Sequence, residues 1–155
     1  AEGWYKPYCL FDGDNIVGEA FLWLGHPGWA LLDYLCVADG CRNSGIGASI
    51  LQKLREREGD TVIFGESEDP DDAPDHDLAV RRLGFYARCG ARDTGFTEHL
   101  FDAWFRILVL DCPGCASLAP EAVVEALADC YRRTISPTQW QKHVQFFAPD
   151  GSVCG

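Results

Sequence analysis

The chain has 155 residues, 47% of them hydrophobic, which is enough for one buried core and argues against a second domain. Its formal net charge of −11 disfavours binding to nucleic acid and to anionic membranes, and it favours cationic partners. No apolar run approaches the roughly 20 residues of a membrane-spanning helix and no secretory signal is recognisable, so we expect a cytoplasmic protein.

The first part of the chain predicts a hairpin and then a buried strand. Residues 4–11 and 16–24 are apolar and aromatic, and the segment between them, Asp-Gly-Asp-Asn, favours a tight turn. Residues 30–37 are almost continuously hydrophobic, which is typical of a strand that is buried on both faces.

A glycine-rich elbow follows this strand at residues 41–47, Cys-Arg-Asn-Ser-Gly-Ile-Gly. Gly45 and Gly47 lack the Cβ that would hinder close approach of a ligand to the backbone. The free N–H groups of the next helix, together with Arg42, can contact an anion. The elbow therefore predicts a phosphate site, and we expect its ligand to be a pyrophosphate.

The rest of the chain alternates helical and extended patterns. Hydrophobic periodicity and turn residues predict helices at 48–57, 78–89 and 120–134, strands at 61–66 and 104–110, and a solvated acidic loop at 68–77. A short helix is expected to end near Phe147. No internal repeat is present.

The order of residues in the elbow is R-x-x-G-x-G, which matches neither the Rossmann fingerprint nor the P-loop. It resembles the acetyl-coenzyme A motif of the GNAT superfamily of N-acetyltransferases. Residues 82–91, with the pair Phe85-Tyr86 and a closing glycine, resemble the second motif of that superfamily. Residues 66–70 are similar to the Glu-x-Glu-x-Pro strand end of a bacterial subgroup, and the resemblance covers roughly residues 4–110.

The resemblance implies an α/β (α+β) chain with a GNAT-like acyl-CoA N-acyltransferase fold, a mixed and mostly antiparallel sheet flanked by helices. Residues 1–111 would form this core, and residues 112–155 a C-terminal helical extension packed on the same domain. The strand and the one or two helices with which the family normally begins are not recognisable. The extension is open to three roles: it covers the sheet, replaces those elements, or forms the contact of a homodimer.

The resemblance also implies acetyl-CoA as co-substrate. Backbone groups at the end of the central strand would pair with its pantetheine arm, and the elbow would hold its pyrophosphate. The residues concerned are Cys36, Val37, Arg42, Asn43, Ser44, Gly45, Ile46 and Gly47. Many members carry an asparagine shortly before the second motif. Residues 75–80 contain none, so Arg81 or Arg82 is a candidate replacement.

Acetylation of an amine requires a base, because an amine with a pKa of about 10.4 is almost fully protonated at neutral pH. Glu66 and Glu68 lie two residues apart near the end of a predicted strand, where open α/β sheets place ligands. We predict that this pair binds the acceptor and acts as general base. Asp33, a carboxylate in an apolar strand, is a further candidate.

The resemblance assigns Tyr86 to protonation of the departing thiolate. A phenol is a weaker acid than a thiol, so Tyr86 would need help from Arg82 or Arg88, or it would act as a hydrogen-bond donor. Each residue also has a structural alternative. Both glutamates can simply begin a solvated loop, and Tyr86 can be a packed aromatic residue beside Phe85.

The sequence thus predicts an N-acetyltransferase that moves an acetyl group from acetyl-CoA to a primary amine by direct attack in a ternary complex. The acidic loop favours a cationic acceptor. The alternative is a non-catalytic acyl-CoA sensor or interaction module. No metal is expected, because the pair Cys112 and Cys115 has no second pair to complete a zinc site, and we expect the eight cysteines to be reduced thiols.

Overall fold

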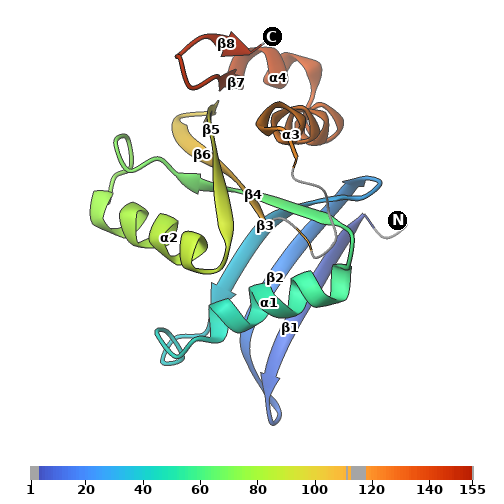
Figure 1. The fold of residues 1–155 in the computed structure, drawn as a ribbon, viewed down its shortest axis with the longest axis vertical. Helices are drawn as coiled ribbons and strands as arrows, with labels where there is room; N and C mark the ends of the chain where they lie inside the picture. The colour runs from blue at the N-terminus through green and yellow to red at the C-terminus, as the bar shows by residue number, and fades with distance from the viewer. Residues whose placement is uncertain (1–3, 111, 113–117, 155) are drawn as a thin grey trace.

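A computed structural model describes residues 4–110, 112 and 118–154 of the chain. One eight-stranded sheet runs through these residues in the order β1-β2-β3-β4-β6-β5-β7-β8 (Figure 1). The elements are β1 (Tyr5–Asp12), β2 (Asn15–His26), β3 (Trp29–Val37), α1 (Ile46–Glu58), β4 (Val62–Glu68), α2 (His76–Arg88), β5 (Ala91–Leu100), β6 (Ala103–Leu110), α3 (Pro120–Thr134), α4 (Pro137–His143), β7 (Val144–Phe147) and β8 (Val153–Cys154).

The sheet is mixed, because β3 and β4 are parallel and the other neighbouring strands pair antiparallel. The parallel pair is joined through α1, as a parallel connection requires a crossover. Figure 1 shows α1 and α2 beside the sheet and α3 apart from them, near β5 and β7. The predicted sheet, mixed and mostly antiparallel with flanking helices, is confirmed.

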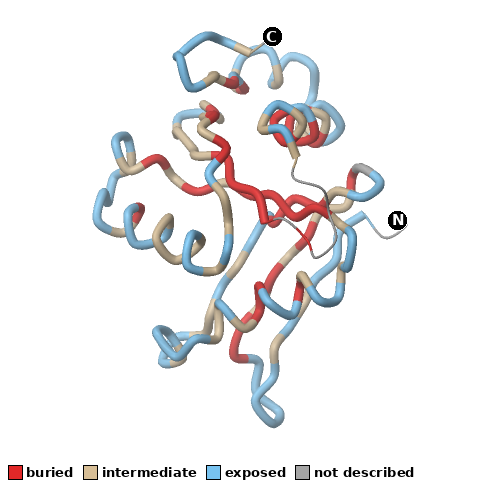
Figure 2. The backbone as a smooth tube through the Cα atoms, in the orientation of Figure 1, coloured by how far each residue is buried: buried red, intermediate tan, exposed pale blue. Residues whose placement is uncertain are grey.

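Two hydrophobic clusters lie on opposite faces of the sheet. One face packs against α3, with Phe64, Ile107 and Leu127 each fully buried. The other face packs against α1 and α2, with Leu22, Leu51 and Ile63 at its centre. Alternate strand residues point to opposite faces, so the central strands β4 and β6 supply both clusters. Figure 2 shows the buried backbone concentrated in these central strands and in α3.

An irregularity in β3 shapes the centre of the sheet. Phe21 on β2 pairs with Tyr34, whereas the next residue, Leu22, pairs with Leu32, so Asp33 is an extra residue in β3. Such a β-bulge bends the strand that carries it. The pairing of β3 with β4 ends at this point, with Leu32 opposite Gly65. Beyond it the two parallel strands separate, and an opening forms between them.

The C-terminal segment differs from the sequence-based prediction. The short helix predicted to end near Phe147 is wrong in its second half, because α4 stops at His143 and residues 144–147 form β7. β7 pairs with β5, a strand that the hydrophobic pattern did not reveal. The segment therefore extends the sheet in addition to covering it with α3.

The expectation of reduced thiols is wrong for Cys112, which is disulfide-bonded. Six other cysteines have free thiols. Cys115, the second member of the predicted pair, lies outside the described residues. In the described ranges, no helix is both long enough and apolar enough to cross a bilayer.

Replacement of Leu127 by alanine tests the packing of α3 on the sheet. Leu127 is 0% exposed within the cluster on this face, so the substitution leaves a cavity. We expect the free energy of unfolding to fall by about 2–5 kcal/mol. Urea denaturation followed by circular dichroism measures the change. Glu125→Ala, at an exposed position of the same helix, is the control and should stay within about 0.5 kcal/mol of the parent.

Candidate active site

The predicted phosphate elbow forms a tight turn before α1. Gly45 is the residue that precedes the helix, and its φ of 82° lies in the left-handed region that favours glycine. Asn43, with a φ of 63°, is also left-handed, and asparagine tolerates this conformation better than most residues do. No side chain caps the first turn of α1, so its N–H groups are available to an anion.

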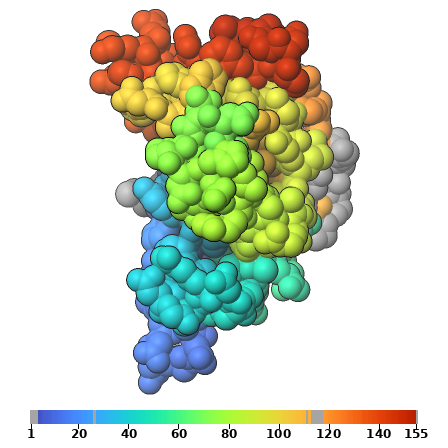
Figure 3. Space-filling view, turned by 90° about the vertical axis from the view of Figure 1, so that its left-hand side faces the viewer, coloured from blue at the N-terminus to red at the C-terminus, as the bar shows by residue number. Residues whose placement is uncertain are grey.

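The other elbow residues support this geometry. The Ser44 hydroxyl donates to the backbone carbonyl of Cys41, which closes the turn. Arg42 is exposed and pairs with Asp39 at 2.9 Å. In a space-filling view the elbow, in cyan, lies directly below α2, in yellow-green (Figure 3). An anion at the elbow would therefore lie at the surface, beside both helices.

Gly47 also has a packing role. A Cβ on Gly47 would come within 3.1 Å of the Phe85 ring, so its missing side chain allows α1 to pack closely against α2. Gly45, by contrast, has open space around a hypothetical Cβ, and its requirement is the left-handed backbone alone. The two glycines of the elbow are therefore needed for separate reasons.

The opening between β3 and β4 leads away from the elbow. Cys36 and Val37 pair with Glu19 and Gly18 on β2, and their other edge faces the gap where β3 no longer pairs with β4. This is the arrangement that the sequence predicted for residues that contact a pantetheine arm.

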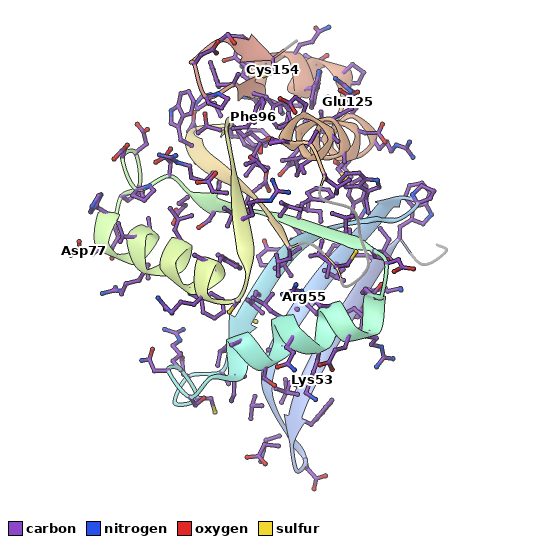
Figure 4. All side chains as sticks on the ribbon, viewed as in Figure 1. Lys53, Arg55, Asp77, Phe96, Glu125 and Cys154 are labelled. Carbon is purple, nitrogen blue, oxygen red and sulfur yellow. The ribbon has the colours of Figure 1, made fainter. Side chains whose placement is uncertain are left out.

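Basic side chains gather where α1 and α2 end. Arg55 and Arg88 line a surface pocket of about 400 Å³ together with Ala48 and Gln52. Arg55 also donates to the carbonyl of Cys89 at 3.3 Å. Figure 4 shows Arg55 and Lys53 on opposite sides of α1, so Lys53 does not join this pocket.

Glu66 lies where β4 separates from β3, and its carboxylate points to the face covered by α3. The Tyr131 hydroxyl on α3 lies 3.0 Å and 2.9 Å from its two oxygens. Burial raises the pKa of Glu66, hydrogen bonds with Glu98 and Tyr131 oppose this rise, and the negative charge of Asp33 adds to it. The first predicted catalytic residue is thus a carboxylate held in a low-dielectric environment.

A second carboxyl group, Glu98 on β5, is 0% exposed on the same face. Apart from their interaction with the Glu66 carboxyl group, its oxygens have no hydrogen-bond partner among the described residues. Burial and the charge of Glu66 raise the pKa of Glu98 far above the usual range of a carboxyl group. Two buried carboxylates cannot both ionise cheaply, so we infer that the pair retains one proton at neutral pH.

Asp33 occupies the bulge of β3 and accepts a hydrogen bond from the Tyr5 hydroxyl. Because the last β3–β4 pair is Leu32 with Gly65, Asp33 and Glu66 are the first residue of each strand beyond the paired region. The negative charge of Asp33 acts on Glu66, so the two carboxylates flank the opening on one face.

Tyr86 reaches the same opening from α2. A small pocket of about 10 Å³ has Glu66, Tyr86, Gly65 and Leu32 among its lining residues. Burial raises the pKa of Tyr86, and the positive charge of Arg82 opposes this rise. The structure therefore brings together two of the three predicted catalytic residues, Glu66 and Tyr86, at the point where the strands part.

The third, Glu68, has another partner. Its carboxylate pairs with Arg82 at 2.6 Å, so Glu68 supports the cation that acts on Tyr86. Asp69 is buried and pairs with Arg106 at 2.7 Å, which fixes the start of the predicted acidic loop. Sequence reasoning missed Glu98 and Tyr131. The alternation of Thr94, Phe96 and Glu98 was the available signal for a buried face.

The described residues contain no cluster of three or more His, Cys, Asp or Glu side chains that could hold a metal ion. The chemistry open to this site is proton transfer between carboxyl, phenol and a bound substrate. Its electrostatics are those of an anionic chamber on the α3 face, with donors for an anion on the opposite face.

Comparison with known proteins identifies the fold. No protein-family model matches the sequence, and no curated protein is significantly similar to it. A GNAT-family protein from Bacteroides thetaiotaomicron superposes with a TM-score of 0.61 at 23% identity, covering 86% of this chain and 73% of the other. The ribosomal-protein alanine N-acetyltransferase from Escherichia coli gives 0.60 at 14% identity, covering 76% and 75%.

A GNAT-family acetyltransferase from Elizabethkingia anophelis, solved with acetyl-CoA bound, gives a TM-score of 0.60 at 14% identity, covering 70% of this chain and 76% of the other. The chain has the fold of GNAT acetyltransferases, and the predicted fold is confirmed.

Replacement of Glu98 by glutamine tests the shared proton. A carboxyl whose pKa is raised by folding binds its proton more tightly in the native state, so its stabilisation is present at low pH and is lost as pH rises above the unfolded value. Between about pH 5 and 8 the parent should lose up to about 1.4 kcal/mol per pH unit relative to Glu98→Gln.

Urea denaturation at several pH values measures this difference. Glu121→Gln, an exposed carboxyl at the start of α3, is the control and should run parallel to the parent. Parallel pH profiles for the parent and Glu98→Gln would contradict a protonated Glu98.

Proposed function

We propose that this protein is an acetyl-CoA-dependent N-acetyltransferase that acetylates a primary amine by direct attack in a ternary complex. The observation that carries the proposal is the opening between β3 and β4, where Glu66 and Tyr86 line one pocket. The predicted phosphate elbow begins where β3 ends, so the opening leads from an anion site to a carboxylate.

The residues of the elbow fit a diphosphate. The backbone N–H groups of Gly45, Ile46 and Gly47 point from an uncapped helix terminus, and Asn43, Ser44 and Arg42 complete the turn. Arg55 and Arg88 offer further positive charge on the α1–α2 side, beside Ala48 and Gln52. Edge groups of Cys36 and Val37 would contact the arm that leads to the thioester, which supplies the activated acetyl group.

Glu66 is proposed as the general base. An ammonium group with a pKa of about 10.4 yields only about one free amine in a few thousand molecules at pH 7, so removal of a proton limits attack. A raised pKa makes Glu66 a stronger base than an exposed carboxylate. The neighbouring charge of Asp33 attracts the cation to the same place.

Tyr86 is proposed as the donor to the leaving group, with Arg82 and Glu68 holding it in place. As the nitrogen forms its bond to the acetyl carbon, the carbon–sulfur bond breaks and the electron pair remains on sulfur. Tyr86 then hydrogen-bonds or protonates this sulfur, and the positive charge of Arg82 makes its hydroxyl a better donor. Glu68 fixes Arg82 through the 2.6 Å ion pair.

The proposal is tested by following free thiol release from acetyl-CoA in the presence of primary amines. Glu66→Gln should lower kcat about 100-fold or more, and Tyr86→Phe about 10-fold or more, because each removes a proton-transfer group. Calorimetric affinity for acetyl-CoA should stay within about twofold, since neither side chain belongs to the elbow. Glu121→Gln is the control and should retain full activity.

Tight binding of acetyl-CoA without thiol release for any amine would favour the sensor alternative. Absence of acetyl-CoA binding would overturn both functions.

A further inference from the structure

A separate pocket of about 350 Å³ lies on the α3 face of the sheet, within the size range of small-molecule sites. Its walls come from β1, β2, β3 and α3, and they include Tyr5, Trp23, Asp33 and Tyr131. None of the elbow residues lines it. It is therefore a second chamber, separate from the proposed phosphate site.

The pocket has apolar and aromatic walls and one charged group. Tyr5, Trp23 and Tyr131 present rings, and Leu31 and Cys130 belong to or pack against the apolar cluster of this face. Among the described residues that line the wall, Asp33 is the one that carries a charge. A cation is attracted both by this carboxylate and by the faces of aromatic rings.

The charge behind the wall has the same sign. Tyr131 separates the pocket from Glu66, to which its hydroxyl is hydrogen-bonded, and the buried carboxyl group of Glu98 interacts with that of Glu66. Among the described residues, no lysine or arginine lines the pocket. An organic anion would be repelled by Asp33 and by the carboxyl groups behind the wall, whereas an ammonium group would be attracted to Asp33.

The pocket also adjoins the proposed reaction centre. Asp33 in its wall and Glu66 behind it are the first residues of β3 and β4 beyond the last pair of the two strands. A nitrogen atom held at Asp33 would face the opening that Tyr86 and Glu66 share.

We infer that this pocket is the acceptor site and that it selects a primary amine carried on an aromatic or apolar body. This inference rests on the proposed function. Asp33 binds the ammonium group, and the rings of Tyr5, Trp23 and Tyr131 enclose the body of the molecule. The chain of a polyamine or a peptide carries further charge or polar backbone, which the rings and the apolar side chains of Leu31 and Cys130 match poorly; Thr134 is the remaining polar side chain among the described lining residues.

In the reaction, one ammonium proton passes to Glu66, and the nitrogen lone pair forms the bond to the acetyl carbon. The bond from that carbon to sulfur breaks with its electron pair on sulfur, and Tyr86 gives its proton to this sulfur. The second proton that leaves nitrogen restores the Tyr86 hydroxyl, and the thiol and the amide are released. Asp33 binds the ammonium group and takes no part in proton transfer, so its loss should affect KM more than kcat.

The test compares 2-phenylethylamine with spermidine and with a lysine-containing peptide in the thiol-release assay. We expect kcat/KM for 2-phenylethylamine to exceed the other two by roughly 10-fold or more, because burial of the ring in apolar walls is worth on the order of 1.5 kcal/mol or more. The neutral analogue 2-phenylethanol should inhibit at least roughly 10-fold more weakly than the amine binds, since it lacks the charge.

Three variants separate the parts of the site. Asp33→Asn should raise KM for 2-phenylethylamine roughly 10-fold while kcat falls less than about threefold. Tyr5→Ala, at a partly exposed position of an edge strand, should reduce the preference for 2-phenylethylamine over n-butylamine about threefold. Asp14→Asn, in the hairpin turn between β1 and β2, is the matched control and should change neither quantity.

Equal or better use of spermidine or the peptide, or an unchanged KM in Asp33→Asn, would overturn the acceptor inference and leave the acetyltransferase proposal intact. Conversely, calorimetric binding of 2-phenylethylamine that depends on Asp33, without thiol release for any amine, would support the pocket and overturn the proposed reaction.

Discussion

The extra residue in β3, Asp33, determines where the pairing of β3 with β4 ends. Parallel strands β3 and β4 would otherwise continue their hydrogen bonds beyond Leu32 and Gly65, and the sheet would be closed. The bulge bends β3 away, which leaves polar backbone edges on both strands without their expected partners. The irregularity in one strand thus separates β3 from β4 beside Glu66.

The two faces of the sheet carry groups that suit ligands of opposite charge. The α1–α2 side offers N–H groups and arginines, which suit an anion, while the α3 side concentrates Asp33, Glu66 and Glu98. Asp33 is exposed, whereas Glu98 is fully buried, where the lower dielectric constant strengthens its interaction with Glu66. Tyr131 belongs to this arrangement, because its hydroxyl is the described donor to Glu66. Although the chain as a whole has a net charge of −11, the surface beside α1 and α2 can therefore attract an anion while the α3 face attracts a cation.

Local patterns in the sequence predicted much of this. The left-handed backbone at Gly45 and the apolar run of β3 depend on residues that are adjacent in the sequence. The order of strand, elbow and helix could therefore be predicted. Glu66 and Tyr86 could each be named as a candidate, but the bulge at Asp33 could not be predicted, because it depends on the register between two strands. β5 was missed because Glu98 interrupts its apolar face, and its burial is decided by β4 and α3.

The hydrogen bond from Tyr131 to Glu66 joins residues 65 positions apart in the chain. During synthesis on the ribosome, the strands up to β6 emerge before α3. The carboxylates on this face therefore remain exposed until α3 can pack on them. Only when residue 131 has left the exit tunnel can Glu66 acquire its partner and lose its water. The buried environment of Glu66 therefore forms only after α3 has been synthesised.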